Sequence, residues 1–215
     1  MTQYGAPTSE YAFYLGIDPG IHGALALMNA AGTTAKVWPM PIRDDGHGNE
    51  IDLVQLRGIL GLLVSPGQRL FTFAGLEWPM PWPGSFENNP ADADNLGRQK
   101  GIIETMLFFH GYAYSRIVPT LWKGRLGLKG KTQDKGSSEA VKLWDALYPQ
   151  FTHLIRGPRG GIQSGPLDAL LIAHFCRQRS SANMAVLREK FKGDPIAGFL
   201  SFGSKRLARK RPRRI

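Results

Sequence analysis

Three acidic residues stand where the chain is expected to leave or enter regular structure. Asp18 follows an apolar run and precedes a Pro-Gly turn, Glu77 ends a second apolar run, and Asp168 lies in the first turn of a predicted helix. Acids at strand ends and at a helix N-terminus converge on one edge of a sheet. Each acid alone is also explained as a turn residue, an exposed strand end or a partner of the helix dipole. Their shared edge is what indicates a carboxylate site.

The charge of the chain is divided along its length. Residues 1–112 carry 6 basic and 11 acidic residues, residues 113–178 carry 10 and 4, and residues 179–215 carry 11 and 2. This division indicates a carboxylate-bearing site held against a polyanion. The final segment, 205–214, is rich in Lys and Arg without an acid, which predicts either an arm that binds phosphates or a solubilising tail.

Composition excludes several classes of protein. The 215 residues include one cysteine, Cys176, so no intramolecular disulfide can form and a reducing, cytoplasmic compartment is expected. No run approaches the roughly 18 apolar residues of a membrane span, and the N-terminus lacks a signal-peptide pattern. Secreted, membrane-spanning and disulfide-scaffold proteins are therefore excluded.

Periodicity and turn residues predict an α/β fold. Three strands form a meander, two further strands read as parallel and central, and helices follow. This order predicts a ribonuclease H-like fold with a mixed five-stranded sheet flanked by helices, in a nuclease domain over 11–180 between extensions at 1–10 and 181–215, the latter basic and partly disordered. The predicted strands are 11–17, 23–28, 33–38, 70–77 and 112–118, the helices 52–64, 96–109, a short one through Trp122, 137–148 and 166–177, and the loops 44–49, 78–95, 127–136 and 156–161.

Four segments carry a family resemblance. GIDPG at 16–20 with GALA at 23–26, IVP and LWK between 117 and 123, the Gly/Lys segment 127–135, and DALLIA at 168–173 occur in this order. Together they resemble RuvC-type Holliday junction resolvases, in particular the bacteriophage and chloroplast branch. The resemblance spans residues 14–178.

The resemblance implies a homodimeric endonuclease of DNA recombination and repair that nicks opposed strands of a four-way junction. Its partners would be branched DNA and a second copy, without membrane or small-molecule cofactor, in the nucleoid of a bacterial or phage-infected cell. By position, Asp18, Glu77 and Asp168 would be catalytic and would hold two Mg²⁺ ions, for which Mn²⁺ substitutes. Hard cations take oxygen ligands, and paired ions activate water and relieve charge on the leaving oxygen, giving 5′-phosphate and 3′-hydroxyl ends.

One departure concerns the fourth metal ligand. The family usually places an acid or His three or four residues before the last Asp, where this chain has Ser164 and Gly165. Either Ser164 or Gln163 supports a metal through water, or Asp92 or Asp94 reaches in from the 78–95 loop. Loss of one anionic ligand predicts a weaker second metal site and a shift towards Mn²⁺.

DNA contacts are predicted from exposed aromatic and basic residues. Aromatic side chains after Glu77 stack on unpaired bases, while lysines and arginines near the active edge contact phosphates. Trp78 either joins them or packs on its own domain, His22 lies at the rim of the site, and Trp122, His174 and Cys176 are assigned to the core. The predicted DNA-binding residues are Trp82, Phe86, Lys123, Lys129, Lys131, Lys135, Arg156 and Arg159.

Other functions remain open at this point. A related nuclease acting on RNA–DNA hybrids, RNA precursors or other branched DNA shares the carboxylates. A junction-binding protein without strong catalysis is an alternative that the neutral Ser164 keeps open. An actin-like kinase would need a second Gly-rich phosphate loop, for which Gly160-Gly161 is too short. The helix over 96–109, with Met106, Leu107, Phe108 and Phe109, is either the dimer interface or ordinary core.

Overall fold

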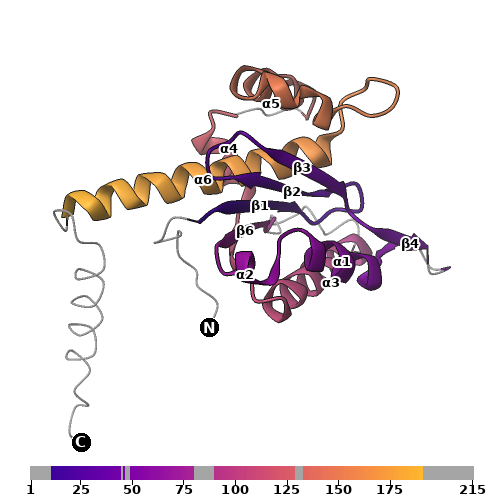
Figure 1. Cartoon of the computed structure of the whole chain (residues 1–215). Coiled ribbons are helices and arrows are strands. Elements are labelled where there is room, and N and C mark those ends of the chain that lie inside the picture. Colours follow the sequence, from indigo (N-terminus) through magenta and orange to yellow (C-terminus); the bar gives the residue numbers. More distant parts are fainter. Residues whose placement is uncertain (1–10, 45, 47–48, 80–89, 129–132, 191–215) are drawn as a thin grey trace, which may run out of the picture.

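A five-stranded sheet lies between two layers of helices in the computed structural model (Figure 1), which describes residues 11–44, 46, 49–79, 90–128 and 133–190. Helix α6 crosses one face with α4 and α5 outside it, and α1 and α3 cover the other face. In chain order the elements are β1 (Phe13–Asp18), β2 (Ala24–Asn29), β3 (Ala35–Pro39), β4 (Ile42–Asp44), β5 (Asn49–Ile51), α1 (Leu53–Leu62), α2 (Pro66–Arg69), β6 (Thr72–Glu77), α3 (Pro90–Phe109), β7 (Ala113–Ile117), α4 (Pro119–Arg125), α5 (Gln133–Leu147), the 3₁₀ helix η1 (Pro149–Ile155) and α6 (Ser164–Lys190).

The strand order of the sheet is β3-β2-β1-β6-β7. β1 pairs antiparallel with β2, and β2 with β3, whereas β1 with β6 and β6 with β7 are parallel. The predicted ribonuclease H-like fold, a meander of three strands followed by parallel ones, is therefore confirmed. No helix among the described residues has the length and apolarity needed to cross a membrane.

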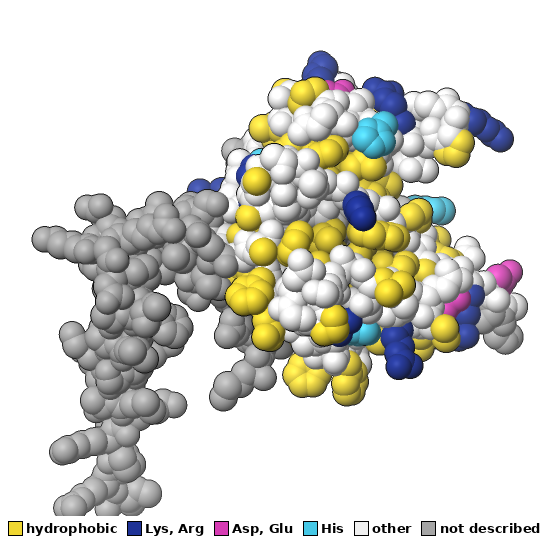
Figure 2. Space-filling model, in the orientation of Figure 1, with side chains coloured by type: hydrophobic (Ala, Val, Ile, Leu, Met, Phe, Trp, Pro, Cys, Tyr) yellow, Lys and Arg dark blue, Asp and Glu magenta, His cyan; other side chains and the backbone are white. Residues whose placement is uncertain are grey.

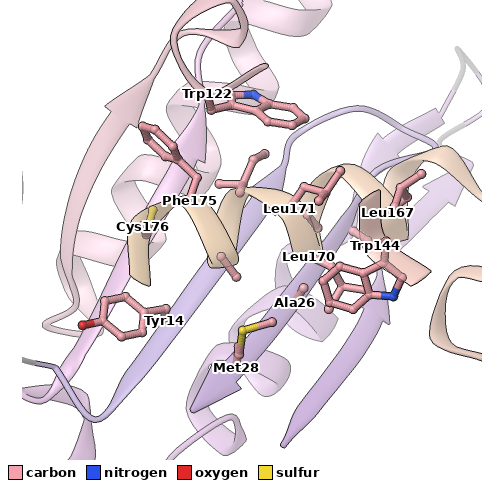
Figure 3. Close-up of a cluster of buried hydrophobic side chains, with 14 of the residues drawn as sticks. Tyr14, Ala26, Met28, Trp122, Trp144, Leu167, Leu170, Leu171, Phe175 and Cys176 are labelled. Carbon is pink, nitrogen blue, oxygen red and sulfur yellow. The ribbon is translucent and has the colours of Figure 1, made fainter. Parts of the chain in front are cut away.

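Alternation along β1 divides the core into two clusters. Tyr14 faces α6 and packs in the cluster that contains Trp122 and Trp144 (Figure 3), while Leu15 and Ile17 face α1 and α3. All five side chains are buried. Because successive residues of a strand point to opposite faces, the even positions of β1 point towards α6, and Asp18 is one of them.

Two glycines let α6 lie close against the sheet. A Cβ on Gly16 would collide with the backbone carbonyl oxygen of Ala169, and a Cβ on Gly75 would lie 2.5 Å from Sγ of Cys176. Gly16 and Gly75 are neighbours across the parallel β1–β6 pair. Because neither glycine has a side chain, α6 packs close to the strands there. This contact sets the distance between α6 and the sheet, and thereby the position of the residues near the start of α6.

Several predicted loops contain regular structure. The 44–49 loop is flanked by the hairpin strands β4 and β5, and the 78–95 and 127–136 loops end where α3 begins at Pro90 and α5 begins at Gln133. Proline is favoured at the first helical position because its missing N–H has no helical partner there, so Pro90 marks a start rather than a break. The short helices α2 and η1 were not predicted, and both also begin at a proline.

The last helix is longer than predicted. It begins at Ser164, two residues before Pro166, and continues past Arg177 to Lys190. Pro166 is tolerated because the first four N–H groups of a helix have no intrahelical acceptor. Asp168 is consequently the fifth residue of α6 and does not lie in its first turn, which corrects the prediction.

Candidate active site at the carboxyl edge of the sheet

Asp18 and Glu77 end neighbouring parallel strands at the same height. Ile17 pairs with Leu76, so the two acids that follow lie side by side on strands about 4.8 Å apart. Each acid is two residues beyond one of the paired glycines, Gly16 and Gly75, and therefore points to the same face of the sheet, beneath α6. The backbone N–H of Gly20 donates to Oδ1 of Asp18 at 3.2 Å, which holds this carboxylate at the turn.

Helix α6 brings Asp168 to this pair. Ala169, next to Asp168, touches Gly16 of β1, and Gly165, one turn earlier, lies against the backbone of His22 and Gly23 in the β1–β2 turn. The start of α6 therefore packs directly against the end of β1, which carries Asp18. The electrostatic coupling of Asp168 with Asp18 and with Glu77 agrees with this placement.

Helix α4 adds a cation and a hydrogen-bond donor. Nζ of Lys123 lies 3.3 Å from Oδ2 of Asp168, and the indole N–H of Trp122 donates to Oε1 of Glu77 at 2.9 Å. Trp122 is fully buried, whereas the Lys123 side chain is 40% exposed. Adjacent residues of one helix therefore contact two different carboxylates, one from inside the core and one from the solvent side.

Burial and mutual repulsion disfavour the charged forms of the acids. Burial, opposed by the hydrogen bond from Gly20 and the charge of Lys123, raises the pKa of Asp18 to about 6. Burial and the neighbouring charge of Asp18 raise the pKa of Glu77 to about 7, although the Trp122 hydrogen bond and Lys123 act the other way. The pKa of Asp168 is raised by burial and lowered in part by Lys123. The single positive charge of Lys123 does not balance the negative charge of the three carboxylates when all are ionised.

The donor set fits a hard divalent cation. Three carboxylates with raised pKa values supply oxygen ligands and unbalanced negative charge, which are what Mg²⁺ and Mn²⁺ require. Among the described residues no group of three or more His, Cys, Asp or Glu side chains is arranged to hold a metal as it stands. The ammonium of Lys123, paired with Asp168, supplies positive charge at this position instead.

The fold distinguishes between the positions considered for a fourth ligand. A Cβ on Gly165 would collide with the carbonyl oxygen of His22, so no side chain fits at that position. Ser164 and Gln163 are exposed and line a cavity beside the carboxylates. Asp94 is exposed on α3, and Asp92 lies in the first turn of α3, where side chains are not described.

Of the other predicted DNA-binding residues, few can be placed. Arg156 and Arg159 are exposed in the turn before α6, and the Arg156 guanidinium donates to the Gly160 carbonyl at 3.3 Å. Lys135 lies on α5, but its side chain is not described. Trp82, Phe86, Lys129 and Lys131 lie outside the described residues.

Trp78 packs on its own domain. The guanidinium of Arg116 lies 4.1 Å from the centroid of its ring, and Nζ of Lys100 lies 4.7 Å from it. Lys100 also donates to the Pro79 carbonyl at 3.2 Å, and Arg116 is paired with Glu104. This cation–π stack fixes the chain directly after Glu77. Of the two roles considered for Trp78, the structure supports packing.

The three predicted core residues are buried. His174 shares a 2.6 Å hydrogen bond with the Tyr148 hydroxyl, and burial lowers its pKa to about 4. Burial likewise raises the pKa of the Cys176 thiol to about 12, so this cysteine is inert. Trp122 is core as predicted, but its contact with Glu77 was missed. The same pattern of a glycine followed two residues later by an acid occurs at 16–18 and at 75–77. This repeated pattern is the sequence signal that Asp18 and Glu77 lie side by side.

The chain resembles two solved structures of RuvC from Thermus thermophilus. The one described as RuvC in complex with Holliday junction substrate is 15% identical with a TM-score of 0.49, and the match covers 81% of this chain and 97% of that one. The other, also 15% identical, has a TM-score of 0.47 with coverages of 77% and 95%. No family model and no curated protein matches the chain.

Proposed function

We propose that this protein is a metal-dependent endonuclease that resolves four-way DNA junctions by paired, symmetric nicks. The observation that carries the proposal is the gathering of three acids from β1, β6 and α6 at one sheet edge. Their pKa values are raised by burial, and those of Asp18 and Glu77 also by the charge of neighbouring carboxylates, Asp168 for Asp18 and chiefly Asp18 for Glu77. Buried, strongly perturbed carboxylates in one cluster are typical of catalytic sites. The four-way junction is chosen as substrate because the sequence motifs resemble the resolvase family.

The carboxylates have a defined task in this reaction. Asp18, Glu77 and Asp168 would hold Mg²⁺, which when bound makes a deprotonated water available at neutral pH and relieves charge on the leaving 3′-oxygen. Trp122 orients Glu77 through its indole N–H, so one oxygen of that carboxylate is held in place. Lys123, partly exposed beside Asp168, balances negative charge and is open to a phosphate oxygen of the bound strand. The products are 5′-phosphate and 3′-hydroxyl ends.

Basic residues provide the polyanion-binding surface. The net charge is +10 overall, while most of the acids, Asp18 and Glu77 among them, lie in the first half of the chain. Phosphate contacts from Lys and Arg supply most of the affinity for DNA and make it salt-dependent. Arg156 and Arg159, in the turn that leads to α6, are the described arginines that we assign to the DNA near the site.

Two related cuts call for two sites, and we assign dimerisation to the end of α3. Leu107 is buried, but Phe108 and Phe109 are 65% and 78% exposed. Leu62, Leu70 and Phe71 are exposed as well. Hydrophobic side chains gather at the lower edge of the view in Figure 2, over α2 and α3. Exposed apolar surface of this kind marks interaction sites.

A nicking assay tests the proposal. A synthetic mobile four-way junction, labelled on each strand in turn, is incubated with wild type or Asp168→Asn in Mg²⁺, Mn²⁺ or EDTA. Paired, ligatable nicks that require metal and disappear in the variant support the proposal. Tight junction binding without cleavage in any metal would contradict it and favour a junction-binding protein, for which the neutral Ser164 is the motivating observation. Cleavage of an RNA–DNA hybrid in preference to the junction would assign a different nuclease.

A further inference from the structure

Lys123 holds an oxygen atom that a metal ion at the carboxylates would need. Its Nζ donates to Oδ2 of Asp168 at 3.3 Å. A divalent cation bound to a carboxylate lies only about 2.0–2.6 Å from the oxygen. An ammonium group and a metal ion on this same oxygen would therefore repel each other at very short range. Metal binding at Asp168 thus competes with the ion pair to Lys123.

The Lys123 side chain has room to leave Asp168. It is 40% exposed, whereas the neighbouring Trp122 is fully buried and donates to Glu77 from inside the core. Trp122 therefore holds α4 in place, and the flexible four-carbon stem of Lys123 extends from a fixed point. Nζ of Lys123 also lies 4.9 Å from the centroid of the Trp122 ring, a cation–π contact that does not depend on Asp168.

The ammonium of Lys123 acts on the whole cluster of acids. Its charge opposes the rise in the pKa of Asp18, Glu77 and Asp168, so Lys123 is a counter-ion to all three. A divalent cation brings twice this charge. With such an ion bound, the cluster no longer requires the ammonium, and the partly exposed side chain becomes available to a phosphate oxygen.

We infer that Lys123 is an exchangeable counter-ion, which pairs with Asp168 in the metal-free protein and turns to a DNA phosphate when a divalent cation takes its place. The inference rests on the proposed function and adds an order of binding events to it. Phosphate contacts of lysine and arginine ordinarily form with or without a metal ion, because they depend on the charge of the DNA. The contribution of Lys123 to DNA binding would instead depend on metal, and this difference is measurable without cleavage.

Two binding measurements test the exchange on wild type, Lys123→Met, Lys123→Arg and the control Lys142→Met. Calorimetry gives the affinity of each DNA-free protein for Mn²⁺. Fluorescence anisotropy gives the affinity for a labelled four-way junction in EDTA and in Ca²⁺, with a denaturing gel to establish that the DNA stays uncut. Lys123 is partly exposed and Lys142 is exposed on α5, so these variants are expected to fold.

The expected pattern separates exchange from an ordinary phosphate contact. Lys123→Met should bind Mn²⁺ roughly threefold to tenfold more tightly than wild type, because no ammonium competes for Asp168. Lys123→Arg keeps the charge and should bind Mn²⁺ no more tightly than wild type. In EDTA, Lys123→Met should lose no more junction affinity than Lys142→Met does. In Ca²⁺ it should bind the junction roughly threefold to tenfold more weakly than that control.

Two results would overturn the exchange while the nuclease proposal stands, provided that wild type nicks the junction. One is Mn²⁺ binding by Lys123→Met that is no tighter than by Lys142→Met. The other is a loss of junction affinity in Lys123→Met that is the same in EDTA and in Ca²⁺, as for a simple phosphate contact. A wild-type protein that neither binds Mn²⁺ nor nicks the junction would overturn both proposals.

Discussion

Replacing Glu77 by Gln is expected to stabilise the metal-free protein at alkaline pH. Glu77 is 8% exposed, and its pKa rises from 4.5 to about 7 in the folded protein. A group whose folded pKa is raised contributes stability below its unfolded pKa and loses it as pH rises through the folded pKa. The loss therefore develops between about pH 4.5 and pH 7, and the glutamine of the variant avoids it because an amide does not ionise.

The magnitude follows from the difference between the two pKa values. A difference of about 2.5 pH units corresponds to about 3 kcal/mol at pH 8, and coupling to Asp18 lowers the expected gain to roughly 2–3 kcal/mol. For a chain of this size that is a rise in Tm of roughly 5–10 °C. At pH 5 the gain falls below about 1 kcal/mol. Glu77 is still mostly protonated in the folded wild type at this pH, and pH 5 is only slightly above its unfolded pKa of 4.5. The amide oxygen of the variant can still accept the Trp122 N–H.

The measurement is thermal unfolding in EDTA from pH 5 to pH 8, with the exposed Glu139→Gln as control. The control variant is expected to change stability by less than about 0.5 kcal/mol at every pH. Mg²⁺ at pH 8 should raise the Tm of wild type more than that of Glu77→Gln, since ligands that bind only the folded state stabilise it. A Glu77→Gln variant no more stable than wild type at pH 8 would refute the assignment of uncompensated buried charge to this site.

Three further predictions concern the surroundings of the carboxylates. Trp122→Phe removes the donor to Glu77 and should weaken Mn²⁺ binding, measured by calorimetry, by about tenfold, whereas Trp144→Phe, an equally buried tryptophan bonded to the Phe151 carbonyl, should leave it unchanged. Gly165→Ala should lower stability to thermal unfolding by about 1–3 kcal/mol because its Cβ meets the His22 backbone, unlike Gly97→Ala, which has open space. Deleting residues 204–215 should weaken junction binding and flatten its dependence on salt; an unchanged slope would remove this segment from DNA binding.

Much of the sheet could be predicted because its signals are local. The strands that became β1, β2, β3, β6 and β7 are short apolar runs ended by turn residues, and their order defines the mixed sheet. Helix starts were harder. Pro90 was placed in the 78–95 loop but begins α3, and the last helix was predicted to begin at Pro166 although α6 begins two residues earlier, at Ser164. The hairpin β4–β5 has strands of only three residues, too short for a periodic pattern.

The approach of the three acids could also be predicted, because strand ends and a helix start meet at one edge. The position of the Lys123 ammonium beside these acids could not be predicted from the sequence. Lys123 was assigned to phosphate contact from its charge and place in the chain, but its pairing with Asp168 depends on how α4 packs through Trp122. The exclusion of a side chain at position 165 likewise depends on contact with a distant turn, at His22.

The charge balance of the site explains how it can lack a fourth acid. Asp18, Glu77 and Asp168 fully ionised, together with the Lys123 ammonium, give a formal charge of −2, which one divalent cation neutralises. A second cation would need further negative charge, yet Gly165 admits no side chain and Ser164 is neutral. Under the proposed function, the phosphodiester of the substrate would supply that charge. The second metal ion would then bind together with DNA, and the hydrolytic centre of the free protein would be completed only when a strand is in place.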